Sequence, residues 1–274
     1  MEEKERFMLS IDQSTQGTKA ILLDSAGMVV GRRDVQHRQI IDEKGWVEHD
    51  LDEIWENTKE AVQEVLRIAG IRPEQVAGLG VSNQRETVAA WNRKTGEPIC
   101  HAVVWQGSRG TKICEMVGAR GFETMIKEHT GLDLSPYFSA SKLAWIYQNV
   151  PEARVLSEQG MLCFGTIDAW LVFKMTGGKS FKTDYSNACR TQLFNIHTLT
   201  WDEEVCGIFG IPMSSLPQVV DSDALFGATD LGGIFENPLP SMAVMGDSDS
   251  ALFGQDCHRM GMGKATCGTG SSIR

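Results

Sequence analysis

The chain has 274 residues and a formal net charge of −10, from 36 acidic and 26 basic side chains. This acidic balance, with no basic stripe, argues against a nucleic-acid partner. The seven cysteines occur singly, so neither a zinc cluster nor a disulfide framework is indicated, and a cytoplasmic setting is expected. The first six residues are too charged for a signal peptide, and no apolar run reaches membrane-spanning length.

A meander of three short strands is predicted at the start, because residues 7–11, 18–23 and 28–30 are apolar runs separated by turn residues. The first turn lies in the segment SIDQSTQGTK, residues 10–19, whose small residues let backbone N–H groups surround a phosphate. Asp12 is expected at the strand end, where a carboxylate can hold Mg²⁺. Ordinary turn chemistry explains the segment equally well, and it is neither a Walker A motif nor a dinucleotide fingerprint.

An amphipathic helix is predicted over residues 50–69, where apolar residues recur at helical spacing between a capping Asp50 and a terminating Gly70. Strands are predicted at residues 76–81, 87–91 and 243–247, and further helices at residues 111–127, 139–149, 167–175 and 201–209. Residues 221–241 form one long turn-rich region. Strands, a helix and strands again are typical of a layered α/β domain.

A second loop of small residues, CGTGSS at residues 267–272, lies near the end of the sequence, shortly after Gly246 and Asp247. Its glycines and hydroxyl side chains suit close approach of the backbone to a phosphate, as in the first loop. The two loops together indicate nucleotide chemistry.

Four further residues are candidates for binding a polyol. Arg85 and Glu86 follow a predicted strand, where a guanidinium and a carboxylate can bind neighbouring hydroxyls as donor and acceptor. Trp105 and Tyr137 can supply flat walls against the carbon face of a polyol. Taken one at a time, a solvated ion pair and core aromatics explain them better.

Taken together, these and other stretches resemble the N-terminal domain of the FGGY carbohydrate kinases, and within them the glycerol kinases. The resemblance runs nearly end to end, in the order of the family. Its stretches are residues 45–50, 82–87, 104–106, 136–139 with Lys142 and Trp145, 164–166, 183–187, Arg190, 193–198, 251–255 and 268–270.

The resemblance implies an α/β fold of the actin-like, ribonuclease H-like ATPase type, with a mixed sheet flanked by helices. Residues 1–274 would be the substrate-binding N-terminal domain, and the C-terminal nucleotide domain would be absent from this chain. The implied activity is ATP-dependent phosphorylation of a hydroxyl on a sugar or polyol. ATP and Mg²⁺ are the implied cofactors. A homo-oligomer of the full-length protein is left open.

The family also implies roles for individual residues. Asp247 would be the general base, and Asp12 would organise Mg²⁺ and the phosphates. The residues implied to contact the nucleotide are Thr15, Gln16, Lys19, Gly268, Thr269 and Gly270. The residues implied to line the substrate site are Arg85, Glu86, Trp105, Tyr137, Asp247, Ser248 and Ser272.

Two departures from the glycerol kinase pattern bear on the substrate. Ser248 stands where glycerol kinases have a glutamine, and Ser272 stands where they have a phenylalanine. Both changes remove bulk, which favours a larger and more hydroxylated acceptor than glycerol. The alternatives are a glycerol kinase proper and a catalytically silent sugar-binding or regulatory domain of the same fold. Without the second domain, little turnover is expected, because closure of two domains aligns the phosphate and excludes water.

Overall fold

A six-stranded mixed sheet carries strands from both ends of the chain in the computed structural model, which describes residues 5–257, 259–267 and 271–273. Its order is β14-β15-β6-β1-β2-β3. The strands are β1 (Phe7–Gln13), β2 (Gly17–Leu23), β3 (Val29–Gln36), β6 (Val76–Asn83), β14 (Gly227–Thr229) and β15 (Leu239–Gly246). The first three form the predicted antiparallel meander, whereas β6 runs parallel to both β1 and β15. The carboxyl ends of β1, β6 and β15 therefore meet at one edge.

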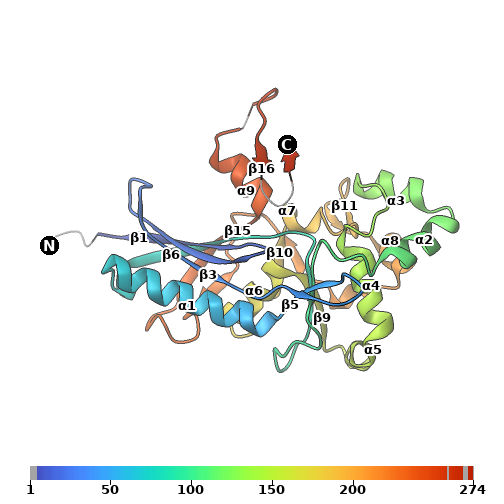
Figure 1. The fold of residues 1–274 in the computed structure, drawn as a ribbon, viewed down its shortest axis with the longest axis horizontal. Helices are drawn as coiled ribbons and strands as arrows, with labels where there is room; N and C mark the ends of the chain where they lie inside the picture. The colour runs from blue at the N-terminus through green and yellow to red at the C-terminus, as the bar shows by residue number, and fades with distance from the viewer. Residues whose placement is uncertain (1–4, 258, 268–270, 274) are drawn as a thin grey trace.

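Two helices, α1 (Leu51–Ala69) and α6 (Ile167–Met175), share one apolar core with this sheet (Figure 1). The predicted caps of α1 are confirmed: the Asp50 carboxylate accepts from two backbone N–H groups, and Gly70 ends the helix at a φ of 66°. Burial alternates along β1, so that Leu9 and Ile11 enter the core while the residues between them face outward. One sheet face is therefore covered.

A five-stranded sheet and a group of helices form a second core beside the first (Figure 1). The strands, in order across the sheet, are β4 (Ile40–Ile41), β5 (Val47–His49), β8 (Ala102–Val103), β7 (Val88–Asn92) and β9 (Leu162–Thr166). The helices are α2 (Thr111–Ala119), α3 (Glu123–Thr130), α4 (Ser139–Asn149), α5 (Pro151–Glu158) and α8 (Glu203–Phe209).

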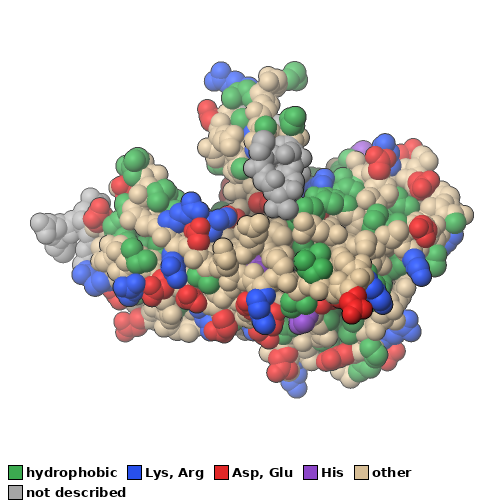
Figure 2. Space-filling view, in the orientation of Figure 1, with side chains coloured by type: hydrophobic (Ala, Val, Ile, Leu, Met, Phe, Trp, Pro, Cys, Tyr) green, Lys and Arg blue, Asp and Glu red, His purple; other side chains and the backbone are tan. Residues whose placement is uncertain are grey.

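Short elements complete the described chain. They are α7 (Tyr185–Ala188), α9 (Asp247–Gly254), the pairs β10 (Lys182–Asp184) with β13 (Gln218–Val220), β11 (Phe194–Asn195) with β12 (Thr200–Trp201) and β16 (Ala265–Cys267) with β17 (Ser271–Ile273), and 3-10 turns at Pro73–Gln75 and Met213–Ser215. Figure 1 shows α9 and β16 projecting from the body on the side away from α1. The surface beside this projection is hollowed (Figure 2).

Some predicted boundaries were wrong, each for a local reason. The single helix predicted over residues 111–127 is two helices, because Gly121 adopts a φ of 81° between α2 and α3. The helix predicted from residue 201 begins at Glu203, since Trp201 pairs with Phe194 in a two-stranded ladder. The turn-rich region at residues 221–241 contains the edge strand β14. None of the described helices combines the length and apolar character that crossing a membrane requires.

Candidate functional site

The candidate site lies where three parallel strands end together. In the pairing register, Asn83 at the end of β6 is opposite Gln13 of β1 on one side and Gly246 of β15 on the other. The segments that follow these strands carry Thr15 and Gln16, Arg85 and Glu86, and Asp247 and Ser248. Residues far apart in the chain, such as Arg85 and Asp247, are thereby brought into contact.

The first loop is tied to the body through Thr15. The indole Nε1 of Trp105 donates to Thr15 Oγ1 at 2.9 Å, and a ring nitrogen of His37 lies 3.0 Å from the Thr15 carbonyl oxygen. Asp12 and Lys19 face each other across the hairpin, with 2.6 Å between Lys19 Nζ and Asp12 Oδ2. Both side chains are about 30% exposed, at 29% for Asp12 and 30% for Lys19, so a ligand can reach them.

Arg85 is a buried cation that contacts two carboxylates. Its side chain is 5% exposed, and it donates from Nε to Asp247 Oδ1 at 3.3 Å and from Nη1 to Asp249 Oδ2 at 2.9 Å. Burial lowers the pKa of Arg85, but the carboxylates of Glu86, Asp249 and Asp247 more than offset this and raise it. A Cβ atom on Gly246 would lie 2.2 Å from Arg85 Cδ, so only glycine leaves room for this side chain.

Glu86 is held in a conformation that few residues adopt. Its φ is 61°, and such left-handed geometry persists only where neighbouring contacts enforce it. Here Arg190 Nε donates to Glu86 Oε1 at 2.6 Å, and the Ser139 hydroxyl donates to the Glu86 carbonyl at 3.2 Å. The Glu86 side chain is 3% exposed. Arg190 was not among the predicted site residues, although it belongs to a stretch that carries the resemblance.

Trp105 and Tyr137 are in ring contact. Their ring centroids are 5.8 Å apart at an interplanar angle of 66°, and the Arg190 guanidinium lies 5.9 Å from the Tyr137 ring. Behind Tyr137, the fully buried Lys142 ammonium donates to the carbonyls of Pro136, Tyr137 and Phe138. Burial lowers the pKa of Lys142 to about 7. The loop that presents Tyr137 is thus fixed from inside the protein.

The predicted residues of the second loop are less well placed. Gly268, Thr269 and Gly270 lie outside the described residues. Ser272 belongs to β17, and Ser248 donates its backbone N–H to Asp247 Oδ1 at 2.6 Å. Roles for these five residues therefore stay predictions, as does the nucleotide role of the exposed Gln16.

The acidic residues suit one kind of metal site. Within the described part of the chain, no three His, Cys, Asp or Glu side chains are grouped as ligands. Mg²⁺ in kinases is bound by one or two carboxylates together with phosphate oxygens and waters, so the single Asp12 carboxylate fits that ion.

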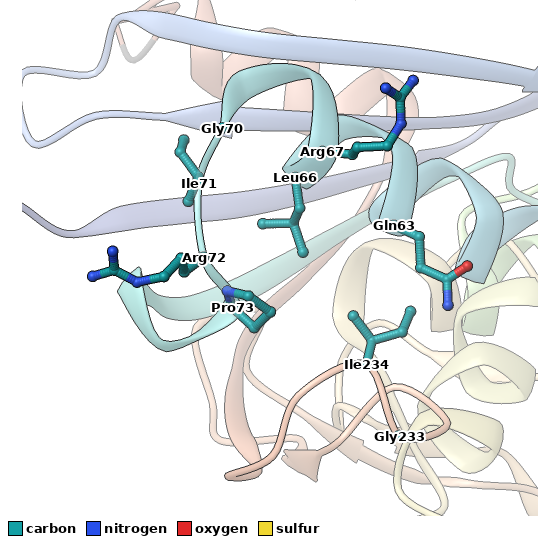
Figure 3. A pocket seen from close by; sticks show the side chains of 9 residues that line it. All are labelled: Gln63, Leu66, Arg67, Gly70, Ile71, Arg72, Pro73, Gly233 and Ile234. Carbon is teal, nitrogen blue, oxygen red and sulfur yellow. The ribbon is translucent and has the colours of Figure 1, made fainter.

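A separate groove of about 540 Å³ lies at the C-terminal end of α1. Figure 3 shows Leu66, Arg67 and Arg72 on one side of it and Ile234 on the other. None of its lining residues was predicted to bind substrate or nucleotide, so it is not part of the candidate site.

Comparisons with known proteins place the chain in a family. The family described as "FGGY family of carbohydrate kinases, N-terminal domain" matches residues 7–254. Glycerol kinase 1 of Thermotoga maritima is 50% identical over 266 residues, which cover 97% of this chain and 54% of that protein. The glycerol kinase of Symbiobacterium thermophilum is 48% identical, over 96% of this chain and 53% of that protein.

Solved structures agree on the fold. Plasmodium falciparum glycerol kinase with ADP superposes with a TM-score of 0.91 at 35% identity, over 98% of this chain and 54% of that one. Gluconate kinase from Lactobacillus acidophilus gives 0.87 at 21% identity, over 98% and 54% of the two chains, and shows the fold alone. The predicted actin-like, ribonuclease H-like α/β fold is confirmed. The chain spans about half the length of the relatives that it matches.

Proposed function

The chain belongs to the FGGY family of carbohydrate kinases, and we propose that its protein transfers a phosphoryl group from ATP to a hydroxyl of a sugar or polyol. The observation that carries this proposal is the contact between Arg85 and Asp247 at 3.3 Å, beside the loop that holds Asp12 and Thr15. Arg85, Asp247 and the first loop lie at one edge of the sheet, and this supports their proposed roles as acceptor-binding cation, base and phosphate loop. Phosphoryl transfer needs mainly such positioning and charge neutralisation.

Asp247 is the proposed general base. Within the described residues, the two hydrogen bonds to its carboxylate, from Arg85 Nε and the Ser248 N–H, both go to Oδ1. Oδ2 is then the oxygen that accepts the proton of the attacking hydroxyl. Its side chain is 49% exposed, so an acceptor can approach it. A positioned base of this kind contributes about 10²- to 10⁴-fold to the rate.

In this proposal the acceptor binds against Arg85, Glu86, Trp105 and Tyr137. Glu86 accepts one hydroxyl, while its ion pair with Arg190 fixes the direction of its carboxylate. Arg85 donates to a neighbouring hydroxyl, and the rings of Trp105 and Tyr137 contact the carbon face. Because these side chains are held by the body, the acceptor is oriented with little loss of side-chain freedom on binding.

We propose that ATP binds with its phosphates at the first loop. Asp12 holds Mg²⁺, which neutralises charge on the transferred phosphoryl group when bound. Lys19, which pairs with Asp12 at 2.6 Å, would supply its ammonium as a donor to the phosphate oxygens. The further proposed contacts to the nucleotide are Thr15, Gln16, Gly268, Thr269 and Gly270.

The nucleotide base is proposed to bind a second domain, with residues 1–274 as the substrate-binding domain. The isolated chain should then bind ATP weakly and turn over little. Titration calorimetry of the chain and of the full-length protein tests this. Micromolar binding of ATP by the isolated chain would contradict it.

The acceptor is proposed to be larger than glycerol, because Ser248 and Ser272 replace bulkier side chains of the glycerol kinase pattern. The relatives named glycerol kinase, at up to 50% identity, make glycerol the competing candidate. Specificity constants of the full-length protein for glycerol, four- to six-carbon polyols and ketoses decide between them. The highest value for glycerol would identify a glycerol kinase proper.

The same assay includes Asp247→Asn. Loss of turnover by about 10²- to 10⁴-fold, with acceptor binding retained, is expected of a general base. A wild-type protein whose melting temperature rises with a polyol but which phosphorylates none would instead be a silent binding domain.

A further inference from the structure

Ser186 joins the core to the turn that begins with Gly246. It lies in α7, and its hydroxyl donates to Asp184 Oδ2 at 2.6 Å while its oxygen accepts from the Gly246 N–H at 2.7 Å. The backbone N–H can only donate, so the one hydroxyl proton is directed to the carboxylate. The bridge therefore has a single arrangement.

Asp184, which accepts the Ser186 hydroxyl, is itself held by several hydrogen bonds. It is fully buried and accepts, in addition to the Ser186 hydroxyl, the N–H groups of Ser186 and Asn187, the Asn187 side-chain amide and the Ser222 hydroxyl. The distances lie between 2.6 Å for Ser222 and 3.0 Å for the backbone donors. A carboxylate with this many donors is held from several directions, because charge-assisted hydrogen bonds are short and strong.

The same network reaches the acceptor side of the site. Asn187 and Asn83 exchange side-chain amide hydrogen bonds at 2.8 and 3.0 Å, and Asn83 also donates to the Gln84 carbonyl at 2.9 Å. Arg85 follows directly in the chain. One buried network thus holds the residue before Arg85 and, through Ser186, the residue before Asp247.

We infer that Ser186 is a positioning residue for Asp247: it sets where the proposed base stands relative to Arg85. This inference rests on the role of Asp247 proposed above. Ser186 touches neither substrate nor nucleotide in this scheme and acts through the Gly246 N–H alone. Without the bridge, the Gly246 N–H at the junction of β15 and α9 loses its hydrogen bond to Ser186, and Asp247, the first residue of α9, is held less firmly. A displacement of about 1 Å at a reacting group is enough to cost about 10²-fold in rate.

The structure offers a matched control. Ser186 and Ser222 both donate a hydroxyl to Asp184 Oδ2 at 2.6 Å, but only Ser186 accepts the Gly246 N–H. Ser222 holds Val244 through its backbone carbonyl, which alanine retains. Ser186→Ala and Ser222→Ala thus each remove one hydroxyl hydrogen bond to Asp184 Oδ2. Only Ser186→Ala also removes the hydrogen bond to the Gly246 N–H.

The variants are compared in the full-length protein, with the acceptor that the wild type uses best. We expect Ser186→Ala to lower kcat about 10- to 100-fold, with the KM for the acceptor within about threefold of wild type. Ser222→Ala and Ser186→Thr, which keeps a hydroxyl, should retain kcat. Equal losses of kcat in the two alanine variants, or an unchanged kcat in Ser186→Ala, would overturn the inference.

Amide exchange of Gly246, measured in the 274-residue chain, gives a readout independent of activity. Exchange should be faster in Ser186→Ala and unchanged in Ser222→Ala. If the wild type phosphorylated no acceptor, the proposed function would fail, while selectively faster exchange would still support the hold on Gly246. Unchanged exchange in Ser186→Ala would overturn that hold even if the protein were an active kinase.

Discussion

The two sides of the candidate site differ in how they are supported. The acceptor wall, formed by Arg85, Glu86, Trp105 and Tyr137, is backed by the body, and the side chains of Arg85 and Glu86 are 5% and 3% exposed. The first turn of α9, which carries Asp247 and Asp249, is called the acid turn below. The side chain of Asp247 is 49% exposed. The buried side chains of the proposed wall are therefore held in place before any ligand arrives, whereas the proposed base, Asp247, is open to solvent.

The strongest challenge to this comparison is Glu86→Ala. It leaves Arg190, whose side chain is only 19% exposed, without its carboxylate, and breaking a largely buried ion pair costs up to about 3 to 5 kcal/mol. Urea unfolding should show this loss. Glu74→Ala, in a pair at 3.7 Å with both partners more than half exposed, is the control and should change stability by less than about 1 kcal/mol. Similar values for the two variants would mean that the wall is not held by its buried charge pair.

Lys142→Met tests the support behind Tyr137. Three carbonyls lose a buried donor, so we expect a loss of about 2 to 3 kcal/mol in the free energy of unfolding. The KM for the acceptor should rise as well, because Tyr137 is no longer fixed. Lys127→Met serves as control, since that lysine is 60% exposed. A lower free energy of unfolding with an unchanged KM for the acceptor would mean that the position of the Tyr137 loop does not affect acceptor binding.

Acid should loosen the support of the first loop. His37 and His49 are buried with ring centroids 4.5 Å apart, and burial lowers the pKa of both, to about 3 for His49. The unfolded chain therefore binds protons near pH 6.5 that the folded protein does not. Stability is complete above that pH and falls as the pH drops below it, and for His49 the fall continues towards pH 3 at up to about 1.4 kcal/mol per pH unit.

Urea midpoints between pH 7.5 and 4.5 measure this dependence. His49→Leu should flatten it, because the leucine cannot take up a proton in the unfolded state. The same slope in both proteins would assign the acid sensitivity to other groups.

The smallest effect on stability is expected at the acid turn. In Asp247→Asn the substituted carboxylate is half-exposed and the buried Arg85 keeps its pair with Asp249, so the free energy of unfolding should change by about 0.5 kcal/mol or less. The large loss of turnover expected for this variant should thus come without loss of fold. A melting temperature lowered as far as in Glu86→Ala would mean that the acid turn contributes as much to stability as the wall does.

Local patterns predicted the framework well. The meander, the helix from Leu51 to Ala69 and the helix from Ser139 to Asn149 follow from apolar periodicity and from cap and turn residues. The break at Gly121 was missed because apolar spacing continues across it. Trp105 shows why single residues are ambiguous: a lone tryptophan is most often a core residue, but this one is half-buried, lies outside both apolar cores and donates its indole N–H to Thr15.

Local patterns proposed single candidates for the site but could not predict which of them lie in contact. The contact of Arg85 with Asp247 depends on the parallel pairing of β6 with β15, which no local pattern specifies. Arg190 and Ser186 gain their partners 104 and 60 residues away. The stretch from Thr183 to Asn187 belongs to the family resemblance and so marked this segment in the sequence. It did not predict that the Ser186 hydroxyl binds the Gly246 N–H.

Gly246 has a consequence for how this protein can vary. Even the methyl group of alanine would lie 2.2 Å from Arg85 Cδ, and displacing that arginine would release both Asp247 and Asp249. In a library that samples all amino acids at position 246 and selects for kinase activity, only glycine should be recovered. Position 246 therefore cannot vary as long as Arg85 keeps its present place.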